Sequence, residues 1–225
     1  FMRHGYLLST LLLIAASAHA GVVINGTRLV YQGDKKESSL GLSNPDATDY
    51  LVQSWVDSGG KNLAKAPFLI TPPLFRLDAK EDNVLRVVRT GGNLPEDRES
   101  LYWLNIKAIP SSKHVEGINT LQIAINTRIK LLYRPSAVKG RPEEVADKLE
   151  WHREGNDLVV NNPTPFYMNF QKVTLNGHKV EKATWATPKT ETHFALPGNV
   201  SGSTVTYSII TDYGSISQTL SKAVN

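Results

Sequence analysis

The stretch LQIAINTRIKLLYRP at residues 121–135 decides the fold class of this 225-residue chain. Its first half alternates polar residues with three aliphatic ones, Leu121, Ile123 and Ile125. A period of two is typical of a β-strand with one buried face. The strand is expected to run from Leu121 to Tyr133 and to stop at Pro135, which lacks an N–H for strand pairing. Two interpretations stay open: an ordinary core strand of a β-sandwich, or a strand that binds another polypeptide.

Short alternating runs recur along the rest of the chain, with Gly-, Pro- and Asn-rich turn signals between them. The predicted strands cover residues 22–31, 38–44, 50–57, 83–89 and 101–109, then 149–153, 157–161, 166–176, 178–182, 204–211 and 215–223. A charged stretch at 136–148 with three Pro or Gly positions at or beside it is typical of an interdomain connection. The pattern predicts an all-β protein with two immunoglobulin-like β-sandwich domains, at 21–139 and 146–225, and a cleft between them.

The first 20 residues indicate the cellular setting. Arg3 and His4 precede an apolar run, and Ala18-His19-Ala20 matches a signal-peptide cleavage site, so residues 1–20 are predicted to be a secretory signal peptide. The chain has no cysteine, which for an exported protein favours the bacterial periplasm. The net charge of +4 is scattered rather than gathered in a stripe, so we expect no nucleic-acid partner.

Catalytic and metal-binding signatures do not emerge from the sequence. There is no G-x-S-x-G elbow, no H-E-x-x-H and no phosphate-binding Gly-rich loop, and cysteine catalysis is excluded. The histidines after the leader are scattered and lack ligand spacing: His114, His152, His178 and His193. We therefore expect a protein that is not an enzyme, with no catalytic residue, no cofactor, no metal and no small-molecule substrate.

Charged residues inside or beside strands form the remaining constellation. Arg28 lies within an alternating run, TRLVY, and Lys130 lies within the strand quoted above. Cations in strands usually face solvent, but two of them in one cleft would bind a carboxylate. Three further charged residues lie near the domain boundary and are candidates for an ion network across the two domains: Glu99, Arg134 and Asp212.

These residues fall within six motifs whose order and spacing are highly specific. They are TRLVY at 27–31, TPPLFRL at 71–77, LPEDRESLYWLNIKAIP at 94–110, LQIAINTRIKLLYRP at 121–135, NPTPFY at 162–167 and TDYG at 211–214. Together they span the chain after its leader, and the chain resembles the periplasmic pilus-assembly chaperones of the chaperone–usher pathway. The resemblance implies two immunoglobulin-like domains in an L or boomerang arrangement.

The resemblance also implies a mechanism and assigns residues to it. Such a chaperone binds pilus or fimbrial subunits by donating a β-strand to an incomplete sandwich, and delivers them to an outer-membrane usher. The donated apolar side chains would be Leu121, Ile123 and Ile125. The subunit's C-terminal carboxylate would be held by Arg28 and Lys130. The interdomain ion network of the family would fall on Glu99, Arg134 and Asp212.

Three matters remain open at the level of sequence. Lys130 has the opposite parity to Ile125 along the strand, so it faces the other side unless a bulge intervenes. The alternative function is that of a structural or adhesive two-domain sandwich protein of a pilus, and a periplasmic hydrolase is a weaker third. The short loop at 111–120 resembles that of the short-loop subclass, which serves rod-forming pili.

Overall fold

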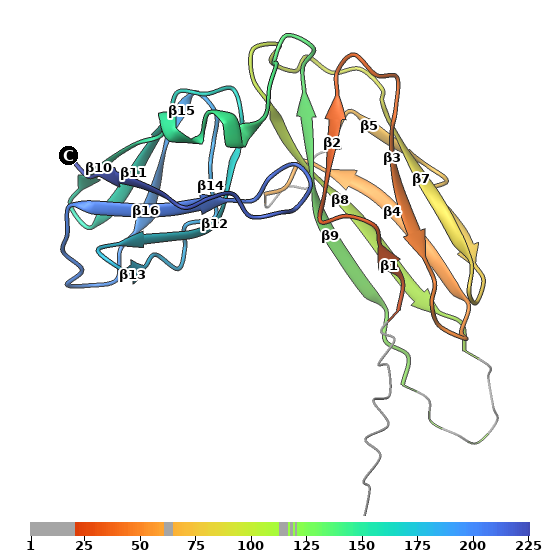
Figure 1. The fold of residues 1–225 in the computed structure, drawn as a ribbon. Coiled ribbons are helices and arrows are strands. Elements are labelled where there is room, and N and C mark those ends of the chain that lie inside the picture. Colours follow the sequence, from red (N-terminus) through yellow and green to blue (C-terminus); the bar gives the residue numbers. More distant parts are fainter. Residues whose placement is uncertain (1–20, 61–64, 113–116, 118, 120) are drawn as a thin grey trace, which may run out of the picture.

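A computed structural model describes residues 21–60, 65–112, 117, 119 and 121–225. Nearly all regular structure in these residues is β-strand, and the strands form two sandwiches that meet at an angle (Figure 1). The predicted all-β fold with two immunoglobulin-like domains in an L arrangement is confirmed. The predicted signal peptide at 1–20 lies outside the described residues. No described helix has the length and apolar character to span a membrane.

The first sandwich packs a four-stranded sheet against a five-stranded one. The four-stranded sheet has the order β1 (Val23–Ile24), β3 (Ser38–Ser43), β7 (Asp82–Arg89) and β5 (Phe68–Thr71). The five-stranded sheet has the order β2 (Arg28–Gln32), β9 (Ile125–Arg134), β8 (Ser100–Pro110), β4 (Tyr50–Asp57) and β6 (Leu74–Leu77). Alternate residues of these strands fill the core, which includes Leu42, Leu85, Leu104 and Leu131, all fully buried.

The expected first strand at 22–31 is in fact two strands in different sheets. β1 pairs with β3, whereas β2 pairs in parallel with β9. Between them, Gly26 has φ +150°, a conformation that side chains disfavour, and its N–H bonds the carbonyl of Ile24. This bend lets the chain cross from one sheet to the other, and it sets Arg28 at the start of β2.

The expected strand 121–133 begins later than predicted, at Ile125. β9 pairs with β8 from Ile125, opposite Ala108, to Tyr133, opposite Ser100. Continuing that register by two residues would set Ile123 opposite Pro110, which has no N–H to donate. Residues 121–124 therefore have no strand assignment, although the alternation in their sequence continues that of the strand.

The second sandwich also has two sheets. One has the order β10 (Glu150–Glu154), β11 (Asp157–Asn162) and β15 (Thr190–Ala195). The other has the order β13 (His178–Lys179), β12 (Met168–Leu175), β16 (Thr204–Ile209) and β17 (Leu220–Ala223), with β14 (Trp185–Ala186) also paired to β12. β14 and β15 were not predicted from the sequence. The large buried side chains of this core are Trp151, Phe166 and Tyr207.

The connection between the domains belongs structurally to the second one. It contains two 3₁₀ turns, η1 (Pro142–Glu144) and η2 (Ala146–Lys148). Val138 and Ala146 are buried in the second core, and the Tyr207 hydroxyl donates a 2.7 Å hydrogen bond to the Ala146 carbonyl. The connection is therefore packed against the domain that follows it, rather than being a free linker.

Candidate functional site

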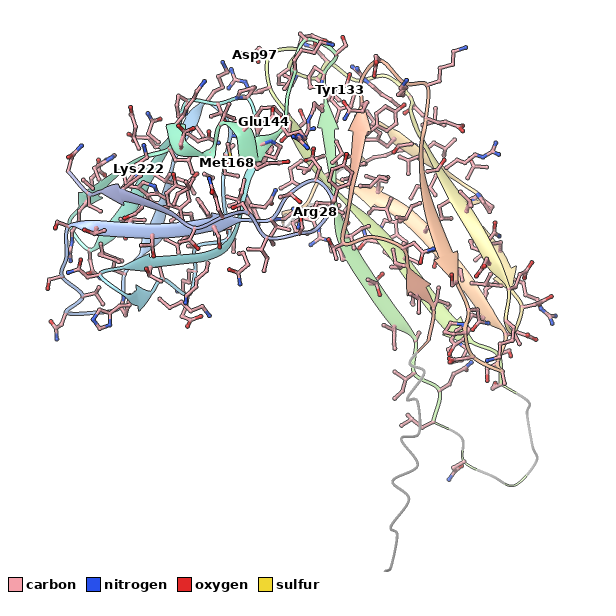
Figure 2. All side chains as sticks on the ribbon, in the orientation of Figure 1. Arg28, Asp97, Tyr133, Glu144, Met168 and Lys222 are labelled. Carbon is pink, nitrogen blue, oxygen red and sulfur yellow. The ribbon has the colours of Figure 1, made fainter. Side chains whose placement is uncertain are left out.

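Two cations lie side by side where the domains meet. β2 and β9 run parallel, and their register sets Arg28 directly opposite Lys130. On the other side of Lys130, β8 contributes Trp103 in the same cross-strand row. Figure 2 shows Arg28 at the junction of the two sandwiches. Like charges directly opposite each other destabilise a sheet, so this pairing indicates a role other than stability.

The second domain supplies neutral partners to this pair. Lys130 Nζ donates a hydrogen bond to Asn169 Oδ1 and lies 4.3 Å from the centre of the Trp185 ring. Arg28 Nη1 donates a 3.5 Å hydrogen bond to the carbonyl of Ile210, and its Nε is buried without a hydrogen-bond partner among the described residues. A hollow of about 240 Å³, lined in part by Arg28 and Asp212, opens beside Arg28.

Burial changes the acid–base properties of both cations. Desolvation lowers the pKa of Lys130 to about 8, with a smaller contribution from repulsion by Arg28. Desolvation also lowers the pKa of Arg28, against a smaller opposing effect of Asp212. The charged forms of both side chains are thus held at a cost that an incoming carboxylate would relieve. The arrangement suits an anion that reaches Nζ of one residue and the guanidinium of the other.

The neighbouring cation on the same strand is different. Arg128 Nη2 bonds Asp57 Oδ1 at 2.7 Å, and Asp57 also accepts a 2.7 Å hydrogen bond from Asn105. The Arg128 guanidinium lies 4.4 Å from the centre of the Trp103 ring. Asp57 neutralises Arg128. Of the two neighbouring cations Arg128 and Lys130 on β9, only Lys130 is therefore available to an external anion.

The first half of β9 offers a free sheet edge. β2 pairs with β9 only at Lys130–Arg134, so within the described residues Ile125–Ile129 has a strand partner on the β8 side alone. Unpaired N–H and C=O groups on an edge are a template for another strand. The three apolar side chains expected to bind a partner are all exposed, and their exposure decreases along the chain: Leu121 is 86%, Ile123 63% and Ile125 50% exposed.

The register of β9 answers the question of parity. Its pairing with β8 is unbroken from Ile125 to Tyr133, with no bulge. Ile125 therefore shares a face with Ile129 and Leu131, which belong to the core of the first domain. Lys130 lies on the opposite face, toward the second domain. One strand thus presents apolar side chains to one side and the cation to the other.

The three charged residues expected at the domain boundary do lie together. Arg134 at the end of β9 donates from Nε to Glu99 Oε1 at 2.8 Å, and from Nη1 and Nη2 to the two carboxylate oxygens of Asp212, each at 2.8 Å. Glu99 Oε2 accepts a 2.7 Å hydrogen bond from the backbone N–H of Tyr167. Arg134 and Glu99 belong to the first domain, whereas Asp212 and Tyr167 belong to the second.

Burial sets the electrostatics of this network. The side chains of Arg134 and Glu99 are 3% and 1% exposed. Burial raises the pKa of Glu99, against the opposing effects of Arg134 and the Tyr167 N–H. Burial disfavours the charge of Arg134, but its hydrogen bonds with Asp212 and Glu99 prevail and raise its pKa. A buried pair of this kind is strongly disrupted when one partner is removed.

Sequence reasoning missed the residues that surround Lys130. Asn169 and Trp185 come from the second domain, some 40 and 55 positions along the chain, and Trp103 comes from β8. The Trp103 and Trp185 rings meet edge to face, with 6.2 Å between their centres. The only signal for them in the sequence is that Trp103 and Asn169 lie within or beside the motifs at 94–110 and 162–167.

The histidines show mixed outcomes. His178 lies in the β13 hairpin and is exposed, as expected, and His114 lies outside the described residues. His152 and His193 lie on β10 and β15, close to several carboxylates. These two histidines, which are scattered in the sequence, lie near shared carboxylates in the fold.

Comparison with known proteins identifies the family. Residues 21–139 match the family described as "Pili and flagellar-assembly chaperone, PapD N-terminal domain", and residues 144–221 match "Pili assembly chaperone PapD, C-terminal domain". The chain belongs to the pilus-assembly chaperones. The resemblance to the pilus-assembly chaperones that the sequence motifs indicated is confirmed. The alternative of a structural or adhesive pilus protein is not favoured.

Individual members of the pilus-assembly chaperone family are similar over most of their length. "Chaperone protein LpfB" of Salmonella typhimurium is 44% identical, over 96% of this chain and 94% of its own. "Chaperone protein FimC" of Escherichia coli K12 is 40% identical, over 94% and 88%. A solved chain from "Salmonella enterica SafA pilin in complex with the SafB chaperone" has 41% identity and a TM-score of 0.83, over 90% of this chain and 96% of that one.

Proposed function

We propose that this protein is a non-enzymatic periplasmic chaperone that binds pilus subunits by donating β9 and the residues before it, and passes them to an outer-membrane usher. The observation that carries the proposal is the pairing of Arg28 and Lys130 in register at the domain junction, with neutral partners. A subunit's C-terminal carboxylate supplies the missing negative charge. The solved SafA pilin complex with the similar SafB chaperone supports a pilin as the partner.

The free edge of β9 supplies the second half of the binding site. A subunit strand that pairs with Ile125–Ile129 extends the five-stranded sheet and meets Leu121, Ile123 and Ile125 on one side. The exposed fractions of these three side chains together equal about two whole side chains. Covering them contributes about 3 to 6 kcal/mol gross, before the cost of ordering the partner.

A hollow beneath two of these side chains fits this role. Ile123 and Ile125 line a cavity of about 260 Å³ together with Ile106, Ala108 and Tyr50. The apolar side chains thus rest over a partly filled space rather than in a close-packed core. They can turn toward a partner at little cost to the first domain.

The domain junction holds the two halves of the cleft in place. Lys130 belongs to the first domain and its partners Asn169 and Trp185 to the second, so the geometry around the carboxylate depends on the interdomain angle. The buried network of Arg134 with Glu99 and Asp212 fixes that angle. Its proposed role is therefore structural, not ligand-binding.

Co-expression with a fimbrial subunit of its own assembly system tests the proposal. The wild type is expected to co-purify with the subunit at one to one. Arg28→Ala is expected to remain folded and to lose the subunit, whereas Arg86→Ala, which removes an exposed arginine from β7 of the first domain, is expected to retain it. Recovery of normal amounts of subunit with Arg28→Ala would reject the assigned carboxylate site.

A further inference from the structure

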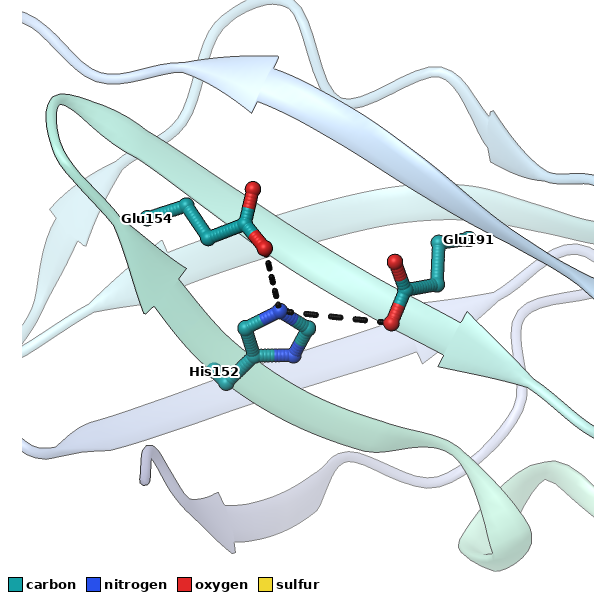
Figure 3. A group of neighbouring side chains, drawn as sticks. All are labelled: His152, Glu154 and Glu191. Atoms are coloured by element: carbon teal, nitrogen blue, oxygen red, sulfur yellow. Dashed lines mark hydrogen bonds and ion pairs between the residues drawn. The ribbon is translucent and has the colours of Figure 1, made fainter.

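The outer face of the three-stranded sheet in the second domain carries a cluster of histidines and carboxylates that the chaperone function does not use. His152 and Glu154 lie two residues apart on β10, and Glu191 and His193 lie two residues apart on β15. Their side chains share a face because residues two apart in a strand point the same way. Figure 3 shows His152, Glu154 and Glu191 converging above the sheet.

The register of the sheet aligns these two pairs. β11 lies between β10 and β15, and Val159 of β11 pairs with His152 on one side and His193 on the other. Val159 is fully buried, yet it belongs to the outer face, because its neighbours Leu158 and Val160 point into the core. A small apolar side chain thus forms the floor of the cluster, and the polar side chains lie around it.

The potential ligand atoms of the three residues lie nearly as close together as those around a bound metal. His152 Nε2 lies 3.4 Å from Glu154 Oε1 and 4.0 Å from Glu191 Oε1. One ligand atom from each of the three residues lies within 4.8 Å of the other two. Ligands about 2.1 Å from a tetrahedral metal are about 3.4 Å apart, so small side-chain rotations suffice to close the site.

The charge around the cluster also favours a cation. His193 Nδ1 lies 3.6 Å from Asp157 and 3.9 Å from Glu154. Among the described residues, the salt bridges of Glu154, Asp157 and Glu191 involve these histidines alone, with no Lys or Arg. Carboxylates on neighbouring strands repel one another when nothing neutralises them. A divalent cation would remove this repulsion.

From this geometry we infer that His152, Glu154 and Glu191 form a binding site for a divalent transition-metal ion, with Zn²⁺ as the fitting ion. An imidazole nitrogen with two carboxylate oxygens suits Zn²⁺, whereas Mg²⁺ and Ca²⁺ take oxygen ligands. His193 faces the second carboxylate oxygen of Glu154 and positions it, and Asp157 in turn faces His193. The bound ion would link β10 to β15 across the middle strand. The spacing along the sequence concealed this site because its two halves are about 40 residues apart.

Isothermal titration calorimetry of the full chain after its leader, with no histidine tag, tests the inference with ZnCl₂ as the probe. One ion per chain is expected for the wild type, and none for MgCl₂ at the same concentration. His152→Gln and Glu191→Gln are each expected to weaken binding at least about tenfold. The matched control is His178→Gln, which removes an exposed histidine of the same domain and is expected to change nothing.

A second measurement keeps the test independent of folding and of subunit binding. In ¹⁵N–¹H spectra of the imidazoles, Zn²⁺ is expected to shift the ring nitrogen resonances of His152 and to leave those of His178 in place. The absence of Zn²⁺ binding by the wild type would overturn the inference, as would equal affinities for the wild type and for both variants. Subunit retention by His152→Gln is expected to be normal, so failure here leaves the proposed chaperone function intact.

Discussion

Replacing Lys130 with methionine is expected to stabilise the free protein while abolishing its function. The pKa of Lys130 is lowered from its ordinary 10.5 to about 8, mainly by burial. A lowering of this size corresponds to about 3 kcal/mol against the charged form in the folded state. The side chain is only half-buried, so solvent screening reduces this figure to about 2 kcal/mol. Loss of the hydrogen bond to Asn169 removes about 1 kcal/mol, which leaves a net gain of about 1 kcal/mol.

Urea unfolding of the free chaperone at several pH values measures this gain. Between about pH 8 and pH 10.5 the folded wild type has released the Lys130 proton, whereas the unfolded chain still holds it. The unfolded state then binds more protons, so wild-type stability rises with pH across this window. The advantage of Lys130→Met is therefore expected to be largest below pH 8 and to disappear toward pH 10.5.

Two controls make the experiment decisive. Lys172→Met removes an exposed lysine from β12 and is expected to shift the free energy of unfolding by less than about 0.5 kcal/mol at every pH. Subunit co-purification by Lys130→Met is expected to fall to background. A methionine variant less stable than the wild type at pH 7, or a pH-independent difference, would show that the lysine is not held at a cost and would refute the reasoning.

Further predictions concern the other parts of the site. Ile125→Asp is expected to reduce subunit retention to background with a change of melting temperature below about 4 °C, measured by co-purification and calorimetry; unfolding of the free protein would instead mark Ile125 as a core residue. Glu99→Ala is expected to cost about 3 to 5 kcal/mol and to broaden the small-angle scattering profile, since Arg134 loses a buried partner; an unchanged profile and melting temperature would count against the interdomain network. Rod-like fimbriae are expected by electron microscopy of cells that express the whole assembly system, and amorphous fibres would reject the short-loop subclass; most of the loop at 111–120 lies outside the described residues.

Local patterns in the sequence predicted what local physics controls. Alternation identified most strands, and the apolar side chains at Ile123 and Ile125 are exposed, as the binding interpretation requires. The strand at Thr190–Ala195 was missed because the positions that share a face with buried Phe194 are the threonines Thr190 and Thr192, so the run lacks alternating apolar residues; its outer face is polar. Polarity on one face is common in a sheet that is solvated on that side.

Contacts between distant segments were beyond reach of pattern alone. Arg28 and Lys130 are adjacent only because the chain changes sheets between β1 and β2, and β2 then pairs in parallel with β9. Nothing in the alternation of either strand specifies that register. The family resemblance assigned the pair, together with Glu99, Arg134 and Asp212. It did not reveal Asn169 and Trp185 around Lys130, or that Asp57 neutralises Arg128, since these depend on how side chains pack across the sheet and the domain junction.

The unbroken register of β9 fixes the distance between Lys130 and the apolar side chains on the same strand. Lys130 and Ile125 are separated by five residues of one straight strand, which corresponds to about 16 Å. In a partner whose C-terminal carboxylate is bound at Lys130, the distance of a residue from the C-terminus therefore determines whether it lies against the apolar side chains. A partner lengthened by one residue at its C-terminus would be displaced along β9 by about 3.3 Å. It would then present the side chains of its other face to Ile125. Selection among partners can thus depend on where a chain ends as much as on what it contains.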